Sequence, residues 1–470
     1  MNWISDKGSD SYGDISQKVG LFDLIAFSTL LVFPFSPIAL KLVITGCWSA
    51  LSLVRPAYYL LSFFVLLFMD SMVVVPIIER SITFVIAPIG VLGALLQFMI
   101  SRDRVRLPGM KIEKSLIIGA TLFFISVLMS TAVSYSSGTI NLLRYESGFI
   151  DQSRGIVILM ILSSGAIVIA MVNRAVVFIY RRLWIIVVAA LFTFILSIMK
   201  EQYGLQRFEG TLGDPNYASR AYLVALIISV YLVKTNTLRI ALTITFIFAI
   251  LETSSRAGFI ATFIALVVWA IQLAKSRKVA TKNRKTLVAA TATIACIIFV
   301  IIVFPGISEL SVFKRMSEAE SFHKGATRIE GDLDRMTGGR TFLWRTSIDE
   351  WADKGPLEIL MGVGVGRSPL LMASKLGKVT VVHNQFLELV LEAGIFGGVA
   401  FLWLVYGIAV TARYAMRGHR VSTQIAVAWT FMSLTLSGIW TKHTFTIILL
   451  FFVVSLMEGE RKKGVSNSLP

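Results

Sequence analysis

Two short polar segments of the sequence carry residue types that suit the binding of a charged group. In the first, Arg207 precedes a turn rich in Gly, Asp and Pro that ends at Asn216. In the second, Ser255 and Arg256 stand next to each other in a connection rich in hydroxyl residues. Arg presents a planar fork of N–H donors that matches phosphate or carboxylate. These two segments therefore predict a site that binds an anionic group.

A third polar segment carries residue types suited to proton transfer. It opens with His383 and Asn384 and leads into an apolar run that contains Glu388 and Glu392. A His side chain gains and loses a proton near neutral pH, so His383 is a candidate general acid or base. The two glutamates are four residues apart and lie on one helix face. Carboxylates in apolar surroundings need a partner, and an Arg is the obvious one.

Ordinary structural roles compete with these functional interpretations. The segment around Arg207 is also typical of a solvated hairpin, Arg256 of an Arg that extends to a membrane surface, and His383 of a helix-capping residue. The Gly-Val-Gly-Val-Gly run at 362–366 lacks the Lys-Ser/Thr of a P-loop, so it predicts a flexible turn. Asp70 lies inside an apolar run and has no assigned role, and no cluster of residues predicts a metal site.

The elements that position these residues follow from an apolar composition. The chain has 470 residues, of which 56% are hydrophobic and 16% charged. Ordinary soluble domains have roughly 45–50% and about 25%. The composition therefore excludes a disordered chain, a disulfide scaffold and an ordinary soluble enzyme.

About fourteen apolar runs are long enough to cross a bilayer core as helices. We expect an all-α, polytopic membrane protein with about 12–14 transmembrane helices. The Phe-Pro-Phe-Ser-Pro sequence at 33–37 indicates either a tight turn between two spans or one broken span. The runs lie near 21–35, 37–54, 57–78, 81–100, 115–134, 155–173, 177–199, 218–234, 239–254, 257–275, 286–306, 385–411, 422–438 and 442–457.

Basic residues predict the orientation of these spans, because short loops rich in Lys and Arg stay in the cytoplasm. Such loops lie at 101–114, 174–182, 275–285 and 413–420, and the C-terminal tail is also basic. Alternating spans place all of them on one side, with both termini in the cytoplasm. The net charge of +17 is then a signal of topology and does not indicate a nucleic-acid partner.

The opposite, outer side receives all three polar segments and also the longest connection, 307–384. A loop of this length inside a compact fold is usually functional. Phe342, Trp344, Ile348 and Trp351 recur within it at near-helical spacing. We expect this loop to form helices that lie against the membrane or cap the bundle.

The three polar segments resemble motifs of the bacterial O-antigen ligase and polymerase superfamily. The segment from Arg207 to Asn216 resembles an Arg-x-x-Gly-(Thr/Leu) turn followed by Pro-Asn. Residues 253–258 are similar to a Thr-x-Ser-Arg-(Gly/Ala)-(Gly/Ala) element. His383 and Gly394 fit a pattern of His, ten residues and Gly. The stretch that begins at Arg340 resembles the large outer loop of these proteins. The resemblance covers about residues 200–400.

The resemblance implies a GT-C-like, inverting glycosyltransferase with its active site at the periplasmic face of the bacterial inner membrane. Its donor is a glycan linked to undecaprenyl pyrophosphate, and no cofactor or metal is implied. Arg207 and Arg256 would stabilise the charge that develops on the pyrophosphate, and His383 would take the proton of the acceptor hydroxyl. Glu392 would hold His383 or an Arg in place.

The resemblance also implies contacts with the substrates and a division of the chain. Residues predicted to bind substrate are Asn216, Ser255, Arg340, Asn384 and Glu392. We expect N-terminal transmembrane helices over 1–200, a catalytic region over 201–411 that includes the loop 307–384, and C-terminal helices with a cytoplasmic tail over 412–470.

Three functions compete at the level of the sequence. The Arg-x-x-Gly-Thr form of the first motif favours a polymerase that joins polysaccharide repeat units, with a chain-length regulator as a partner. A ligase that attaches the glycan to lipid A-core has the same motifs. A flippase or secondary transporter would show inverted repeats and broken helices near mid-membrane, and the sequence shows no such repeat.

Overall fold

The computed structural model describes a set of apolar helices together with part of the long outer loop. The described residues are 21–69, 74–75, 80–100, 114–136, 178–201, 215–233, 235–253, 255–275, 340–376, 382–416, 424–425, 427–429, 447, 450–451 and 453–454. The predicted spans at 155–173 and 286–306, the turn that contains Arg207, and Asp70 lie outside these residues.

The described elements are helical apart from one pair of two-residue strands. The N-terminal part contains α1 (Leu21–Val32), the 3₁₀ helix η2 (Phe33–Phe35), α2 (Ile38–Val54), α3 (Pro56–Met69), β1 (Val74–Val75), β2 (Arg80–Ser81), α4 (Thr83–Ile100) and α5 (Lys114–Ser136). The central and C-terminal parts contain α8 (Trp184–Glu201), α9 (Pro215–Leu232), α10 (Asn236–Glu252), α11 (Arg256–Lys275), α15 (Arg340–Ala352), α16 (Pro356–Met361), α17 (Ser368–Leu376) and α18 (Gln385–Met416).

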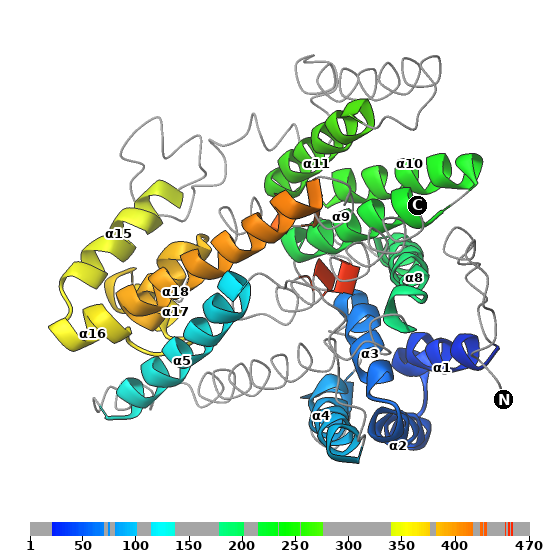
Figure 1. Ribbon diagram of the computed structural model, residues 1–470, viewed down its shortest axis with the longest axis horizontal. Helices are drawn as coiled ribbons and strands as arrows, with labels where there is room; N and C mark the ends of the chain where they lie inside the picture. The colour runs from blue at the N-terminus through cyan, green and yellow to red at the C-terminus, as the bar shows by residue number, and fades with distance from the viewer. Residues whose placement is uncertain are drawn as a thin grey trace, which may run out of the picture.

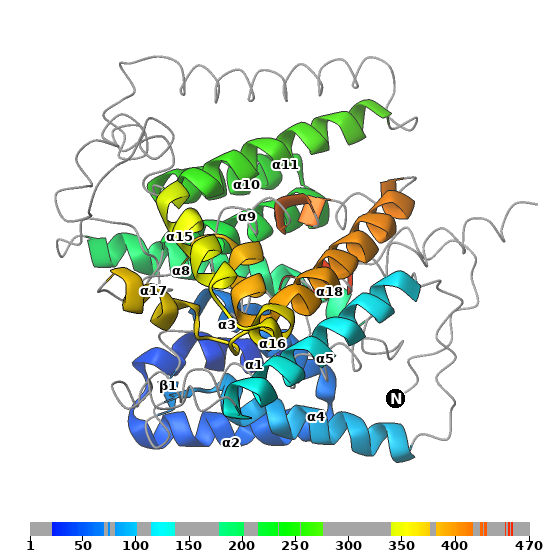
Figure 2. The ribbon, with the colours of Figure 1, turned by 90° about the vertical axis from the view of Figure 1, so that its left-hand side faces the viewer.

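The helices form three groups (Figure 1). The first contains α1 to α4 with α8, and the second contains α9, α10 and α11. In the third, α5 lies along α18, and the outer-loop helices α15, α16 and α17 pack against α18. Figure 2 shows the same groups from the side, with α9, α10 and α11 toward the top, α2 and α4 toward the bottom, and α5 beside α18. Helix α8 contacts α9 and so joins the first two groups.

Most described helices match the apolar runs predicted from the sequence. At the Phe-Pro-Phe-Ser-Pro sequence, the chain forms η2 and then starts α2 after Pro37, which agrees with the predicted alternative of a turn between two helices. One helix differs from its predicted run. Helix α3 ends at Met69, earlier than the predicted span end at 78, and β1 pairs antiparallel with β2 just beyond it. An apolar run alone does not fix where the helix inside it ends.

Several helices expose large apolar side chains as stripes. On α10, Ile240, Ile244 and Phe248 recur every four residues and are 60%, 63% and 49% exposed. Soluble proteins rarely expose such continuous apolar faces, whereas lipid-facing helices do. Among the described residues, the segment Gln385–Leu404 is long and apolar enough by itself to cross a membrane, and several shorter apolar helices accompany it.

A buried charged cluster joins the ends of α1, α3 and the segment before α8. Asp23 is 3% exposed; its carboxylate pairs with the Arg182 guanidinium at 2.7 Å and accepts a hydrogen bond from the Tyr58 hydroxyl at 2.6 Å. The guanidinium also lies over the Phe178 ring, 3.6 Å from its centroid. All three charged or polar groups belong to the predicted cytoplasmic side, so their contact is consistent with the predicted alternation of spans.

We expect Arg182→Ala to destabilise the protein by roughly 3 kcal/mol, because it leaves the Asp23 carboxylate buried without its cationic partner. The measurement is thermal unfolding of the protein in lipid nanodiscs. Arg181→Ala is the matched control, since Arg181 is the exposed neighbour. Adding Asp23→Ala to Arg182→Ala should recover part of the loss. Equal unfolding temperatures for Arg182→Ala and Arg181→Ala would contradict the role of the ion pair.

Candidate active site

Two of the predicted polar segments meet at the start of α9 and α11. Asn216 is the second residue of α9, and its side-chain carbonyl accepts a hydrogen bond from the Ser255 hydroxyl at 2.9 Å. The same hydroxyl oxygen accepts a hydrogen bond from the Gly258 amide at 3.1 Å, which fixes the first turn of α11. Ser255 is buried. These two predicted substrate-binding residues therefore hold their two segments together.

The hydrogen bonds of Ser255 fix the backbone at the start of α11, where Arg256 is the first residue. Arg256 is the first residue of α11, directly after the turn that Thr253 and Ser255 form. The Thr253 hydroxyl donates to the Ile250 carbonyl at 2.7 Å and accepts a longer bond of 3.3 Å from the Ser255 amide. Arg207, the other predicted cation, lies outside the described residues. Its pairing with Arg256 in one site stays a prediction.

A third arginine, which the sequence analysis did not select, lies one helical turn beyond Asn216. Arg220 is 1% exposed, and its guanidinium lies 5.7 Å from the centre of the Tyr217 ring. A charged side chain within an apolar segment is costly and usually functional. The signal was present in the sequence, since Arg220 falls inside the predicted span 218–234. Arg220 is therefore a further buried arginine on the helix that begins at the Asn216–Ser255 contact.

His383 stands at the turn that starts α18. Its backbone has φ 56°, the left-handed region that residues other than Gly rarely adopt, and its side chain is half-buried. Asn384 follows as the helix cap: its side-chain carbonyl accepts hydrogen bonds from the amides of Phe386 at 2.9 Å and Leu387 at 3.2 Å. The structure thus gives Asn384 a capping role, and this fixes the direction of the chain beside His383.

Helix α18 is kinked one-third of the way along, at Gly394. This residue has φ 68° and ψ −171°, a conformation essentially restricted to Gly. A non-helical residue interrupts the helical hydrogen-bond ladder and frees backbone carbonyls. The Gly-rich turn at 362–366 supplies donors to two carbonyls there: the Val363 amide binds the Leu391 carbonyl and the Gly364 amide binds the Glu392 carbonyl, both at 3.0 Å.

The side chain of Glu392 on α18 also binds this turn. Its carboxylate accepts hydrogen bonds from the Gly366 amide at 2.7 Å and from the Ser368 amide at 3.0 Å, at the start of α17. The Ser130 hydroxyl of α5 also donates to the Glu392 carbonyl. The Gly-rich run forms the predicted turn, and these hydrogen bonds attach it to α18, which the sequence did not indicate. That Glu392 would bind this turn through its carboxylate was not predicted. Substrate binding by Glu392 stays a prediction.

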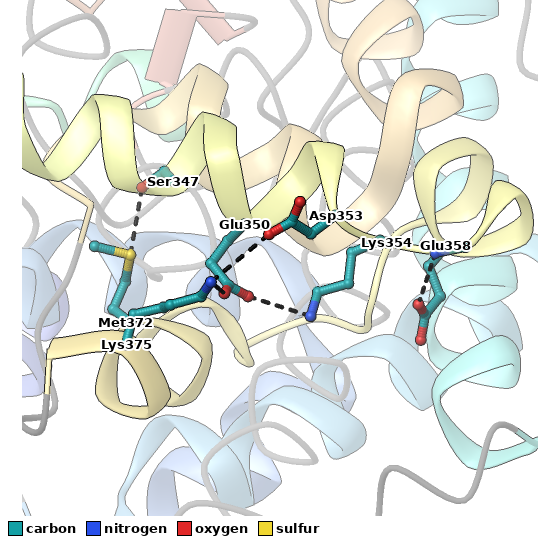
Figure 3. Close-up of polar contacts among 8 residues, drawn as sticks. Ser347, Glu350, Asp353, Lys354, Glu358, Met372 and Lys375 are labelled. Carbon is teal, nitrogen blue, oxygen red and sulfur yellow. Dashed lines mark hydrogen bonds and ion pairs between the residues drawn. The ribbon is translucent and has the colours of Figure 1, made fainter.

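The outer-loop helices α15 and α17 are joined by a small network of charges (Figure 3). The Glu350 carboxylate lies 3.0 Å from the Lys375 ammonium and 3.2 Å from that of Lys354, and Lys375 also reaches Asp353 at 3.6 Å. Burial raises the pKa of Glu350, but the hydrogen bonds and charges of Lys375 and Lys354 outweigh it and hold the pKa below its ordinary value. The hydrogen bond to Glu350 raises the pKa of Lys375.

The remaining predicted site residue, Arg340, is the first residue of α15 and is half-buried. Helix α15 packs against both α17 and α18, so Arg340 belongs to the same group of elements as His383. Across the described part of the chain, no three or more His, Cys, Asp or Glu side chains are placed to share a metal ion.

These elements define a helical protein with exposed apolar stripes and two polar turns that open helices, at α11 and at α18. Residues 241–402 match the O-antigen ligase family, so the chain carries a domain of that family over this range. The resemblance inferred from the motifs is confirmed there. No curated protein matches the chain.

The match covers Ser255, Arg256, Arg340, His383 and Glu392, but it begins after Arg207 and Asn216. The hydrogen bond between Ser255 and Asn216 therefore attaches the preceding segment to the family domain. Proteins of this family are membrane proteins, in agreement with the exposed apolar stripes on the helices.

We expect Gly394→Ala to destabilise the clasp, the set of hydrogen bonds between the turn at 362–366 and α18, by more than about 2 kcal/mol. A Cβ at this position would meet the Leu360 carbonyl and the Gly362 amide, in a backbone conformation that Ala does not adopt. The measurement is limited proteolysis of the outer loop in nanodiscs, where the variant should be cleaved faster.

Gly46→Ala is the control for this substitution, because a Cβ at Gly46 in α2 meets nothing within 4 Å. It should leave the cleavage rate unchanged. If the Gly394→Ala loop is cleaved no faster than that of Gly46→Ala, the clasp does not depend on the kink.

The contact between α15 and α17 should weaken in acid. Because the pKa of Glu350 is lower in the folded protein, its contribution is complete above the unfolded value of about 4.3 and is lost as pH falls through the folded value. The raised pKa of Lys375 keeps its contribution complete below about 10.4, with loss as pH rises through the folded value. Hydrogen-exchange protection of α15 and α17, corrected for intrinsic exchange, should be constant from about pH 5 and fall below about pH 4.

Glu350→Gln should remove most of this acid dependence, since the amide does not titrate. Asp349→Asn is the matched control, because Asp349 is an exposed neighbour on α15, and it should retain the acid dependence. An unchanged acid response in Glu350→Gln would assign the effect to another group.

Proposed function

We propose that this protein is an inverting membrane glycosyltransferase that transfers an undecaprenyl-pyrophosphate-linked glycan to an acceptor sugar at the periplasmic face of the bacterial inner membrane. The observation that carries the proposal is the family match, since it contains both the Ser255-Arg256 turn and the His383 turn. The hydrogen bond from Ser255 to Asn216 supports it by joining the segment that follows Arg207 to the same domain.

The anionic part of the donor would be bound by arginines. Negative charge develops on the pyrophosphate as the bond between the sugar C1 and its oxygen breaks. Fixed cations in a site with little water stabilise such charge strongly. Arg256, at the first turn of α11, and Arg207 would supply this stabilisation, and buried Arg220 lies one turn from Asn216 to add to the positive potential.

His383 would act on the acceptor. Its imidazole takes the proton from the acceptor hydroxyl while the hydroxyl oxygen bonds to C1 from the side opposite the pyrophosphate. The C1–O bond to the pyrophosphate breaks in the same event, so undecaprenyl pyrophosphate leaves and the configuration at C1 inverts. The left-handed backbone of His383 and the cap by Asn384 support this role, because they fix the base relative to α18.

Glu392 would contribute as a positioning residue. Its carboxylate binds the amides of Gly366 and Ser368 and so ties the outer loop to α18, two helical turns beyond the start of the helix. A loop held in this way keeps Arg340 and His383 within one group of packed elements. Binding energy then need not be spent on ordering the loop when substrate arrives.

The acceptor distinguishes two versions of this activity. We favour a polymerase that joins one lipid-linked repeat unit to another in O-antigen or exopolysaccharide synthesis, on the form of the Arg207–Asn216 motif. A ligase that attaches the glycan to lipid A-core is the second candidate, favoured by the description of the matched family as O-antigen ligase.

Cells that lack the protein should show which acceptor is used. Loss of a polymerase leaves single repeats on lipid A-core. Loss of a ligase leaves none, and long lipid-linked chains accumulate. Complementation with His383→Ala or Arg256→Ala should lower glycan transfer by about 100-fold or more, the usual effect of removing a general base or a fixed charge. The measurement is the polysaccharide banding pattern together with transfer rates in reconstituted vesicles.

Arg239→Ala is a matched control for Arg256→Ala. Arg239 lies in the first turn of α10, where its guanidinium binds the Val233 carbonyl at 2.7–2.9 Å. The Arg239→Ala variant should transfer glycan at the rate of the unaltered protein. Normal transfer by both His383→Ala and Arg256→Ala would overturn the mechanism. An unchanged surface glycan in the deletion strain would overturn the function.

A further inference from the structure

The first residue of α18 is a buried glutamine whose side chain has no hydrogen-bond partner in the part of the chain that the structure describes. Gln385 is 0% exposed, and neither its amide nitrogen nor its amide oxygen has a hydrogen-bond partner among the described residues. Buried polar side chains are nearly always hydrogen-bonded in folded proteins, and each exception calls for an explanation. An unpaired amide costs stability, whereas an apolar side chain of the same shape would not.

Gln385 is placed where a substrate would be. It follows His383 by two residues, and Asn384 between them fixes the turn. Along α18, Gln385 shares one buried face with Glu388 and Glu392, which are 6% and 0% exposed. This face therefore presents a row of polar groups that begins beside the proposed base.

The chemistry of the amide indicates the kind of ligand. A primary amide offers an N–H donor and a carbonyl acceptor side by side. Two adjacent hydroxyl groups of a sugar ring present the complementary pair, and so does an acetamido group. A protein site built to hydrogen-bond such groups rejects analogues that lack them, because its own buried groups are then left unpaired.

We propose that Gln385 is a specificity-determining residue that binds the acceptor sugar whose hydroxyl is activated by His383, an inference that rests on the proposed function. The acceptor is the relevant substrate because its hydroxyl must lie against the imidazole, within the same turn of the chain. The sugar displaces the side chains that cover Gln385, a scale of rearrangement that is common at binding sites. The amide then gains the two hydrogen bonds that the described residues do not provide.

The competing explanation is that an enclosed water satisfies the amide and that Gln385 serves only the fold. The two explanations differ for Gln385→Met, which keeps the length of the side chain and removes its polar atoms. If the amide waits for a sugar, Met relieves an unfavourable group and the free protein is as stable or more stable. If water completes a structural network, Met breaks it and the protein is less stable.

The test uses the full-length protein in vesicles, with lipid-linked glycan extracted from cells that lack this protein as the probe. We expect Gln385→Met to keep or raise the unfolding temperature and to raise the KM for the acceptor by about 10- to 100-fold with little change in kcat. Gln385→Glu is the second variant: it keeps acceptor oxygens but loses the N–H donor, and its KM should also rise.

Gln424→Met is the matched control. The amide nitrogen of Gln424 is also without a partner among the described residues, and its side chain is 2% exposed, but it lies at the predicted cytoplasmic end of a span. This variant should leave KM unchanged. A lowered unfolding temperature for Gln385→Met, unchanged kinetics, or a fall in kcat alone would each overturn the proposal.

Failure of this inference is distinguishable from failure of the proposed function. If the unaltered protein does not transfer the extracted glycan, the function itself is wrong and the inference falls with it. If the unaltered protein is active and Gln385→Met behaves like Gln424→Met, only the assignment of Gln385 is wrong.

Discussion

Hydrogen-bonding groups removed from water must find partners. At the kink of α18 this requirement determines how the turn at 362–366 and helix α5 are attached to α18. The interruption at Gly394 exposes backbone carbonyls inside a packed region, and the Gly-rich turn supplies the amides that bind two of them. In the other direction, the carboxylate of Glu392 accepts hydrogen bonds from amides of the turn. The kink in α18 is therefore where the loop is attached to the helix. Helix α5 is attached at the same place, because the Ser130 hydroxyl donates to the Glu392 carbonyl.

The sequence predicted those features that depend on local pattern. Long apolar runs identified α2, α4, α5, α9, α10 and α11 to within a few residues, because a helix that faces lipid needs apolar side chains on nearly every position. The start of α18 agrees with the apolar run predicted from 385, but the cap is Asn384, whereas a capping role had been considered for His383. The Ser255 segment was expected to connect two helices and does lie between α10 and α11, although its partner Asn216 could be found only in three dimensions.

Features that depend on contacts between distant segments could not be predicted in this way. The hydrogen bonds that the Glu392 carboxylate accepts from the Gly366 and Ser368 amides could not be predicted, because backbone amides leave no trace in residue types. The expected role of Glu392 in holding His383 or an Arg stays a prediction. Gly394 is part of a predicted motif, but its kink was not predicted. A single sequence does not distinguish a Gly that kinks a helix from a Gly that allows two helices to pack closely. Arg220 was overlooked because a lone charge at the edge of an apolar run resembles an ordinary interfacial Arg.

The cluster of Asp23, Tyr58 and Arg182 has a consequence for biosynthesis. Tyr58 is 35 residues from Asp23 along the chain, whereas Arg182 follows Asp23 by about 160 residues. At a synthesis rate of about 5–20 residues per second, the cation is made roughly 8–30 seconds after the anion. The hydrogen bond from the uncharged Tyr58 hydroxyl to the Asp23 carboxylate is therefore available first, while α1 to α3 assemble. The ion pair forms only when the segment before α8 arrives. Chain order thus makes the docking of α8 the step that neutralises a charge already placed within the growing bundle.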